Sequence, residues 1–524
     1  MALRCTHARA GLGRTPSLAS IDLQCEMTGD TMKSNPVSRN KQYLTTASAT
    51  LGALALGSVI GYTTHSLSQL TAEDKTTSGD ELRLTSTEGS WFASSANLGA
   101  VVGGVIGGLA ASRIGRRGTL LAAAPPFIAG WLMIAFANDF SLLLLGRLLT
   151  GVCMGAVCTV APPYIGEFAS PDIRGALGSC FQVMLTTGIL YAFVLGALVR
   201  SWRLQAILCT IPLVLLLICM FFAMESPIFL LTKGKKDEAA TALQHFRGKD
   251  YNIEEEMQVL KESVEDAQRN RISMKDLKKP YILKPLFISL FLMFFQQTTG
   301  VPAVMFNLIT VFRESGSALS DDMSVILIGI VQVLATISGS VLVDRAGRKK
   351  LLIISTSFMA LSIVGMGVYS FVSLLGRSWA RVSMPPIDLP PAPVSPIGAI
   401  PLVFLIVFIV AFSIGLGPVP WLMMGELFPS NVRETAASLA TAVNWSSAFV
   451  ITLIFDSMTT ALGDHGNYWV FGGICVLAIL FSACFVPETK GKTLLEISAY
   501  FGGTAEVTEP AELRAGEGIA EKAV

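Results

Sequence analysis

Five amide side chains and one tryptophan stand inside stretches of the sequence that are otherwise apolar. They are Gln182, Gln296, Gln297, Gln332, Asn444 and Trp421. An amide donates and accepts hydrogen bonds together, and a polar group among lipid or apolar side chains is costly unless it is paired. Such residues therefore face the interior of a helix bundle. There each one either joins two helices or binds an uncharged ligand.

The composition is that of a polytopic membrane protein. Of the 524 residues 52% are hydrophobic and only 15% are charged, and the mean hydropathy is +0.58. A net charge of +1 without an Arg-rich arm excludes nucleic acid as a partner. The sequence has no metal-ligand spacing, no phosphate-binding loop and no Ser/His/Asp set among its apolar runs. We therefore predict no enzyme activity, no cofactor and no obligate protein partner.

Twelve apolar runs are long enough to cross about 30 Å of hydrocarbon as helices. Six lie near 44–66, 91–111, 118–137, 141–165, 175–199 and 204–223, and six near 285–312, 323–343, 350–375, 398–424, 436–460 and 468–486. We expect an all-α membrane protein of 12 transmembrane helices in two pseudo-symmetric six-helix bundles, 44–223 and 285–486. The remaining segments are an N-terminal tail (1–43), a linker with short amphipathic helices (224–284) and a C-terminal tail (487–524).

The two halves repeat three signatures in the same order. Gly115 and Gly347 are each followed by two basic residues, Glu167 and Glu426 each precede an arginine by seven positions, and ESP at 225–227 corresponds to PET at 487–489. A long internal repeat in a hydrophobic chain predicts two homologous bundles. The basic residues of the short loops predict that both termini are cytoplasmic. We expect a multi-pass protein of the plasma membrane.

The repeated charges also predict a gate at the cytoplasmic ends of the helices. An exposed ion pair contributes only about 0 to 1 kcal/mol, but a network of several pairs can bias an equilibrium between two conformations. The alternative is that these charges only anchor helix ends and set the topology. The gating residues would be Arg113, Arg116, Arg117, Glu167, Arg174, Asp344, Arg345, Arg348, Glu426 and Arg433.

An ordered set of motifs runs from about residue 44 to residue 500. It comprises GRR, GRLLTGVCMG, PPYIGEFASPDIRGALG, ESP, FFQQTTG, DRAGRK, GLGPVPWLMMGELFP and VPETKGKTLLEI. This set resembles the sugar porter family of the major facilitator superfamily. With HFRGKD and FNLITVFRESGS, it is most similar to the insect facilitated trehalose transporters and the related facilitative glucose transporters. The resemblance implies the major facilitator fold and facilitative transport of trehalose, glucose or a related hexose by alternating access.

The resemblance also implies which side chains bind the sugar. The family's sugar-contacting amides match Gln182, Gln296, Gln297 and Asn444. Gln332 replaces a usual Asn, and Trp421 takes a sugar-stacking and gating role. A sugar presents vicinal hydroxyls and an apolar C–H face, which suit amides and an aromatic ring. Trp445 belongs either to the core or to the wall of the cavity.

Glycine and proline predict hinges beside this site. Gly417, Pro418 and Pro420 must loosen the span at 398–424 and free backbone carbonyls. Pro302 replaces a further sugar-contacting Asn of the family, and Asn307 stands where the family often has a Tyr of the external gate. A proline-rich segment at 376–397 is expected to be extended, because proline lacks an amide donor.

The first span carries no acid from Gly61 to His65, where proton symporters of the superfamily typically have an Asp. His65 is expected to be solvated at the outer end of its helix, and Asp456 is a weak candidate for proton coupling. The sequence therefore favours a uniporter. The alternatives are a proton-coupled sugar symporter and a sugar sensor that does not transport.

Overall fold

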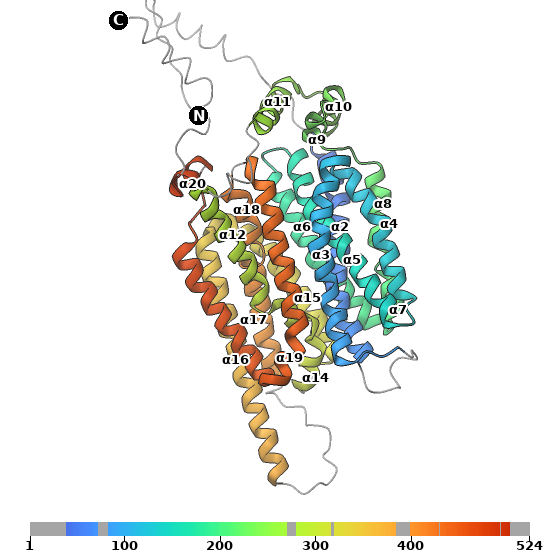
Figure 1. Cartoon of the computed structure of the whole chain (residues 1–524), viewed down its shortest axis with the longest axis vertical. Coiled ribbons are helices and arrows are strands. Elements are labelled where there is room, and N and C mark those ends of the chain that lie inside the picture. Colours follow the sequence, from blue (N-terminus) through green and yellow to red (C-terminus); the bar gives the residue numbers. More distant parts are fainter. Residues whose placement is uncertain are drawn as a thin grey trace, which may run out of the picture.

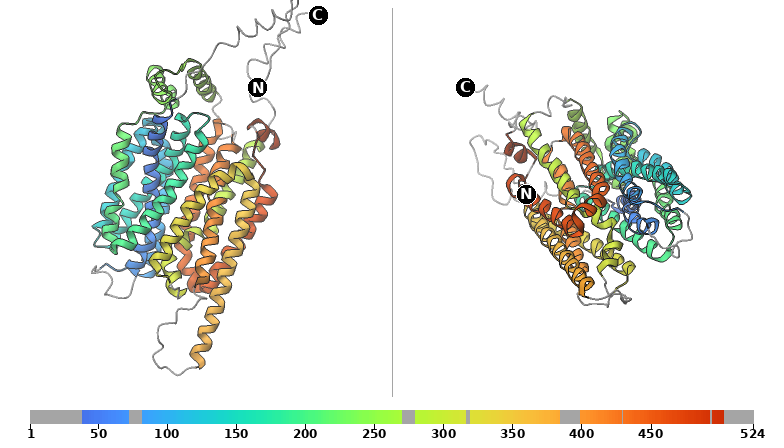
Figure 2. Two further views of the ribbon diagram at one scale, coloured as in Figure 1. Left: turned by 180° about the vertical axis from the view of Figure 1, so that it is seen from behind. Right: turned by 60° about the horizontal axis from the view of Figure 1, so that its bottom comes forward.

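A computed structural model of the chain describes residues 38–71, 82–269, 279–315, 319–383, 399–428, 430–492 and 494–502. Two bundles of helices stand side by side, one built from the first half of the chain and one from the second (Figures 1 and 2). Three short helices of the linker lie across one end of the first bundle. We call this the linker end, and the opposite end the far end.

The first bundle contains six crossing segments. Its helices are α2 (Asn40–Thr71), α3 (Ser86–Ile114), α4 (Arg116–Ala135), α5 (Phe140–Phe168), α6 (Arg174–Val199), α7 (Trp202–Leu208) and α8 (Ile211–Phe221). Helices α7 and α8 together form one crossing, from Trp202 to Phe221. Thr85 begins α3 with a capping box to Glu88, and the side chain of Asp139 caps α5.

The second bundle is built from longer and more interrupted helices. They are α12 (Pro280–Thr298), α13 (Val301–Phe306), α14 (Leu308–Ser315), α15 (Asp321–Ala346), α16 (Arg348–Ser383), α17 (Ile400–Ile414), α18 (Val419–Leu427) and α19 (Ser430–Phe485). Helix α19 has 56 residues and a non-helical backbone at Gly463 (φ 71°). Its apolar part of 51 residues is about 77 Å long at 1.5 Å per residue, enough for two crossings.

The described residues therefore confirm the expected fold. Eleven helical segments are long and apolar enough to span a membrane, and the one in α19 crosses twice. Twelve crossings in two bundles result. Each bundle has its own hydrophobic core, and each core takes in a few side chains of the other half where the bundles meet, Trp445 and Ala448 on one side and Ile189 and Phe193 on the other.

Close helix packing in the first bundle depends on glycine. A Cβ atom at Gly103 in α3 would lie 1.9 Å from the carbonyl oxygen of Val152 in α5, and one at Gly155 in α5 would lie 2.2 Å from that of Ala100. Only glycine lets the two backbones approach so closely, as is common between membrane helices. This packing fixes α3 and α5 as a rigid pair.

The linker helices are α9 (Pro227–Thr232), α10 (Lys236–Arg247) and α11 (Glu254–Arg269), which share a small apolar core. Arg247 joins them to the first bundle, because its Nη1 donates 2.8 Å to the carbonyl oxygen of Phe168 while its Nη2 pairs with Glu256 at 2.6 Å. A final short helix, α20 (Leu494–Tyr500), lies at the same end (Figure 1).

Helix α16 differs from the expectation of an extended segment at 376–397. The helix continues to Ser383 and projects beyond its neighbours at the far end (Figure 1). The reason is that the first proline of the segment is Pro385, so nothing in 376–383 interrupts the helical hydrogen bonds. The prolines themselves lie outside the described residues.

Candidate functional site

Three amide side chains meet in the middle of the second bundle. Gln296 in α12 donates through Nε2 to the carbonyl oxygens of Leu416, at 3.1 Å, and Gly417, at 2.6 Å. Asn444 in α19 donates through Nδ2 to Oε1 of Gln296 at 2.6 Å, and Gln297 donates through Nε2 to Oδ1 of Asn444 at 3.0 Å. We call Gln296, Gln297 and Asn444 the amide cluster.

The amide cluster is anchored on a break in the helix formed by α17 and α18. Helix α17 ends at Ile414 and α18 begins at Val419. Pro420 has no N–H, so it cannot make the helical bond to the carbonyl of Leu416 four residues earlier. The carbonyl of Leu416 is therefore free to accept from Gln296, which also donates to the neighbouring carbonyl of Gly417. The sequence Gly-Pro-Val-Pro thus creates the acceptors, and α12 supplies the donor.

Burial distinguishes the members of the amide cluster. Gln296 is 2% exposed and Asn444 is fully buried, whereas Gln297 is only partly buried. Asn444 also donates to the carbonyl oxygen of Met293. Trp421 in α18 is partly buried and packs in a small apolar group with Met293. The cluster therefore has a sealed side, an accessible amide and an aromatic ring nearby.

The other two sequence-predicted amides stand on other helices, α6 and α15. Gln182 is partly buried on α6, one turn from Gly178, and a Cβ atom built at Gly178 meets no atom within 4 Å. Gln332 in α15 is 4% exposed, and its Oε1 has no hydrogen-bond partner among the described residues. No hydrogen bond within the described part of the chain links either glutamine to the amide cluster. Trp445 is buried and belongs to the core of the first bundle.

At the linker end of the first bundle, Arg116 pairs with Glu167 at 2.9 Å, and both side chains are largely buried. The hydroxyl of Ser226 donates to the other carboxylate oxygen of Glu167. Glu225 accepts from the backbone N–H groups of Arg116 and Arg117, at 2.9 and 3.1 Å. These N–H groups begin α4, so the carboxylate caps the positive end of a helix.

The second bundle repeats this arrangement group by group. Arg348 pairs with Glu426 at 2.8 Å, and Thr489 donates to Glu426 at 2.6 Å. Glu488 accepts from the backbone N–H groups of Arg348, at 2.9 Å, and Lys349, at 3.2 Å, at the start of α16. The repeated sequence signatures therefore build one structure twice, and each of these ion pairs joins residues of a single half.

The capping acid Glu488 lies outside the crossing segments. Burial acts to raise its pKa, but hydrogen bonds from the backbone N–H groups of Lys490, Arg348, Lys349 and Thr489 favour the charged carboxylate more strongly. The pKa of Glu488 therefore lies below its ordinary value.

The other predicted gating residues have varied surroundings. Arg117 donates to the carbonyl oxygens of Met220 and Phe221, which ties α4 to α8. Arg174 donates to the carbonyl oxygen of Ala169 at 3.3 Å. Exposed side chains occur at Arg113, Arg174 and Arg345. The side chains of Asp344 and Arg433 lie outside the described part of the structure.

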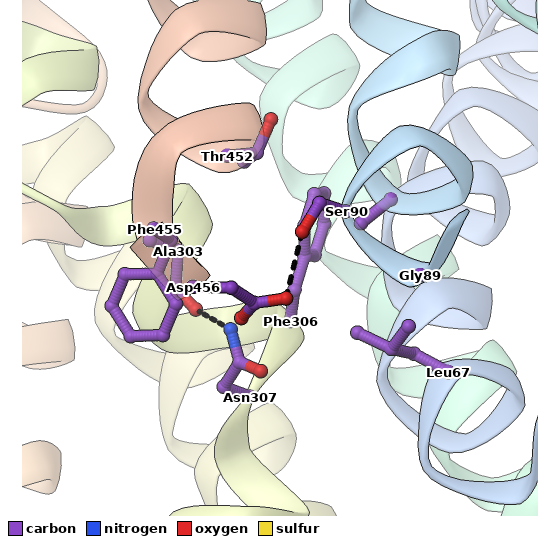
Figure 3. A pocket seen from close by; sticks show the side chains of 10 residues that line it. Leu67, Gly89, Ser90, Ala303, Phe306, Asn307, Thr452, Phe455 and Asp456 are labelled. Carbon is purple, nitrogen blue, oxygen red and sulfur yellow. Dashed lines mark hydrogen bonds between the residues drawn. The ribbon is translucent and has the colours of Figure 1, made fainter. Parts of the chain in front are cut away.

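Polar contacts join the two halves at the far end. Ser90 in α3 donates to Asp456 in α19 at 2.7 Å (Figure 3), and Thr64 in α2 donates to the carbonyl oxygen of Met305 at 2.8 Å. At the linker end, by contrast, space lies beside α5, α6 and α18. A Cβ atom there would meet no atom within 4 Å at Gly166, Gly175, Gly178 or Gly425.

A second break lies in the first crossing of the second bundle. Gly300 has φ +91° between α12 and α13, a conformation that favours glycine. Pro302 occupies the first turn of α13, where a missing N–H does no harm. The break therefore falls at Gly300, two residues before the proline that the sequence pointed to. Asn307 follows α13 and donates to the carbonyl oxygen of Ala303 at 2.9 Å.

A buried cation stands near the first span. Arg147 in α5 is fully buried and donates to the carbonyl oxygens of Phe92 and Val59, both at 3.2 Å, and to Oγ1 of Thr63 at 2.7 Å. These hydrogen-bond partners are two backbone carbonyls and a hydroxyl, and none of them is a carboxylate. His65, expected to be solvated, is instead 2% exposed: it packs on Phe193 of α6, and its Nε2 lies 3.3 Å from Oδ1 of Asp322 in α15.

A family model described as "Sugar (and other) transporter" matches residues 45–501. The chain belongs to this sugar transporter family. Curated proteins similar to it include the facilitated trehalose transporter Tret1 of Apis mellifera ligustica, 37% identical over 91% of both chains. Another is Tret1 of Drosophila erecta, 39% identical over 88% of this chain. The chain spans only about half the length of several such relatives, 52% in the Drosophila erecta protein.

Solved structures of similar fold include two of a bacterial sugar transporter. A partially occluded inward-open conformation of the xylose transporter XylE from E. coli superimposes with a TM-score of 0.70, at 24% identity over 86% of this chain and 99% of that one. The proton:xylose symporter XylE bound to 6-bromo-6-deoxy-D-glucose also has a TM-score of 0.70, at 25% identity over 88% of this chain and 99% of that one. The major facilitator fold follows.

Sequence reasoning missed several residues that the structure makes prominent. Arg147 stands within the motif GRLLTG and is the one charge inside the apolar run at 141–165, which was a usable signal. Glu225 and Glu488 were visible only as parts of repeated motifs, and their capping role needed the contact with α4 and α16. Nothing in the local sequence around Ser90 indicates its contact with Asp456.

Proposed function

We propose that this protein is a facilitative sugar carrier that moves trehalose, glucose or a related hexose by alternating access. The observation that carries this proposal is the amide cluster, in which Gln296, Gln297 and Asn444 meet at a broken helix. Relatives named facilitated trehalose transporters support the choice of sugar. No part of the cluster is charged, which suits a neutral ligand rich in hydroxyl groups.

Gln297 is the first contact in this proposal, because it is the partly buried member of the cluster. Gln296 and Asn444 hold its amide in place, and Trp421 offers an aromatic ring to the apolar face of the sugar. Gln182 and Gln332 would complete the site from α6 and α15 when the halves move. The unpartnered Oε1 of Gln332 supports a role for that residue as a hydrogen-bond acceptor.

Alternating access requires that the two ends open in turn. The contact of Ser90 with Asp456 holds the far end together, and the empty space beside Gly178 and Gly425 supports an open linker end. In this proposal the linker end is cytoplasmic, both termini are cytoplasmic, and the protein resides in the plasma membrane. The Arg–Glu pairs hold together the helix ends of their own half, so that each half moves as one body when the proposed gate at the linker end opens.

Uniport is the proposed mode of transport. A proton-coupled carrier needs a titratable group that changes its charge during the cycle. Arg147 is bonded to Thr63 and two backbone carbonyls rather than to an acid, which supports a site without a coupled proton. The second candidate is a proton symporter, favoured by the likeness to the proton:xylose symporter XylE. Accumulation of sugar above equilibrium under an imposed pH gradient would favour that candidate.

Uptake by oocytes that express the chain tests the substrate. Labelled trehalose and labelled glucose are offered separately, and surface abundance is measured in the same cells. We expect saturable uptake of at least one of the two above water-injected oocytes. Uptake of neither sugar, despite normal surface abundance, would contradict the proposed function.

A further inference from the structure

A small cavity lies between the two halves at the far end (Figure 3). Helices α2 and α3 line it from the first bundle, and α13 and α19 from the second. The carboxylate of Asp456 closes it by accepting hydrogen bonds from two serines of α3. Both hydroxyls reach the same oxygen, Oδ2, from Ser90 at 2.7 Å and from Ser86 at 3.4 Å.

The lining combines hydrogen-bonding groups with aromatic rings. Besides the carboxylate it includes the amide of Asn307 and the hydroxyl of Thr452, with the rings of Phe306 and Phe455 beside them. Charged and amide groups that hydrogen-bond hydroxyls, next to aromatic faces that pack on C–H groups, form the surroundings that a sugar requires. The amide cluster, which carries no charge, likewise has hydrogen-bonding side chains near an aromatic ring.

The bonds of Asp456 cannot survive the opening of the far end. The carboxylate belongs to α19 of the second bundle and its serine partners belong to α3 of the first, so the groups must separate when the bundles part. A partly buried carboxylate without donors is costly. Once this end is open, water or the hydroxyls of an arriving substrate can take the place of the serines. Two neighbouring hydroxyls of a sugar supply the same pair of donors as Ser86 and Ser90.

We propose that this cavity is an outer recognition site for sugar, in which Asp456 exchanges its two serine hydroxyls for two hydroxyls of the arriving substrate. The proposal rests on the proposed function. Asp456 lies twelve residues beyond Asn444 along α19, which is about 18 Å of helix. A sugar that comes from the far end would thus bind at Asp456 before it reaches the amide cluster.

The exchange is tested by comparing two variants that break the same hydrogen bonds from opposite sides. Asp456→Ala removes the carboxylate, whereas the double change Ser86→Ala and Ser90→Ala removes its partners and leaves the carboxylate in place. Uptake of labelled trehalose and glucose from the far side is measured over a range of concentrations. Asp464→Ala, which removes an exposed carboxylate at the same end, is the matched control.

We expect Asp456→Ala to raise the half-saturation concentration for uptake by at least about tenfold, because the carboxylate accepts two hydrogen bonds and each bond to a charged group contributes about 1.5 to 3 kcal/mol. The double serine variant should not raise the half-saturation concentration, because this variant only weakens the closed far end and so exposes the carboxylate more often. Asp464→Ala should match the unmodified chain. If Asp456→Ala does not reach the surface, Asp456→Asn, with its weaker acceptor, should show a smaller rise.

An unchanged or lowered half-saturation concentration in the Asp456 variants would overturn the inference. An equal rise in the double serine variant would do the same, since Asp456 would then serve only to hold the halves together. Both of these outcomes require an unmodified chain that transports sugar. A failure of the proposed function would be seen instead as an unmodified chain that moves neither trehalose nor glucose.

Discussion

The side chain of Gln296 donates a hydrogen bond of 2.6 Å to the backbone carbonyl oxygen of Gly417. This bond ties α12 to the break between α17 and α18, where a helical N–H is missing. The same amide also donates to the carbonyl oxygen of Leu416, which Pro420 leaves without its helical donor, and its own oxygen remains to orient Asn444. Gln296 thus supplies a donor to the carbonyl groups at the helix break and also belongs to the proposed sugar site.

Replacing Gln297 by Ala should weaken transport while leaving the folded protein intact. Gln297 donates only to other side chains, so its loss leaves no backbone carbonyl without a donor. Loss of one neutral hydrogen bond, about 0.5 to 1.5 kcal/mol, corresponds to a rise of roughly two- to tenfold in the half-saturation concentration. Surface abundance should not change. Unaltered transport by Gln297→Ala would remove this residue from the site.

Replacing Gln296 by Ala should reduce both transport and stability. The change leaves the carbonyl oxygens of Leu416 and Gly417 without their donor in a buried setting, at a cost of about 1 to 3 kcal/mol. Thermal unfolding of the purified variant in detergent measures that loss. Gln258→Ala, at an exposed position of the linker, is the control and should change neither property. A Gln296 variant as stable as the unmodified chain would show that these bonds contribute little.

The Arg–Glu pairs should couple within each half and not between halves. A double-mutant cycle on Arg116→Ala and Glu167→Ala should give a coupling energy between about 0.5 and 3 kcal/mol, because the two side chains touch. A cycle on Arg116→Ala and Glu426→Ala should be additive within about 0.5 kcal/mol. Thermal unfolding supplies the energies. Stronger coupling across the halves than within them would refute this pairing.

Glu488 should make stability depend on pH in the acid range. Its folded pKa is lowered, so its contribution is present above the unfolded value, about 4.3 for Glu, and is lost as pH falls through the folded pKa. Glu488→Gln should therefore lower the melting temperature at neutral pH. The difference in melting temperature between this variant and the unmodified chain should become smaller as the pH falls. A gap that stays constant from about pH 7 to about pH 3 would contradict this assignment.

Gly103→Ala should destabilise the first bundle. The added methyl group would collide with the carbonyl oxygen of Val152, and overpacking of this kind typically costs about 1 to 3 kcal/mol. Gly108→Ala, on the same helix but with open space around the new methyl group, is the matched control. It should leave stability unchanged or raise it by up to about 1 kcal/mol. Equal effects of the two changes would mean that α3 and α5 can move apart freely.

The crossings were predictable because each depends on a local property, the length of an apolar run. The residues of the amide cluster were also predictable, since Gln296 and Asn444 are polar groups in apolar helices. Their mutual bonds were not, because the contact joins positions far apart in the chain and depends on the break at Gly417. Likewise, the burial of His65 follows from the approach of α6, which no local pattern encodes.

The pairing of the repeated charges could not be predicted from the sequence either. Their spacing correctly marks two copies of one structure, and Arg116 and Arg348 have matching partners. The spacing does not say whether an acid pairs within its own half or with the other, since both choices satisfy the same sequence. In the structure each acid pairs within its own half, and the hydroxyl of the segment that follows that half, Ser226 or Thr489, donates to the same acid.

The most direct test of the central claim is the final concentration of labelled sugar inside proteoliposomes that contain the purified chain. We predict that trehalose or glucose enters until the inner concentration equals the outer one, at the same level with and without an imposed pH gradient, and that Gln297→Ala slows the approach to this level. No uptake above protein-free liposomes would contradict sugar transport. An inner concentration above the outer one under a pH gradient would contradict uniport.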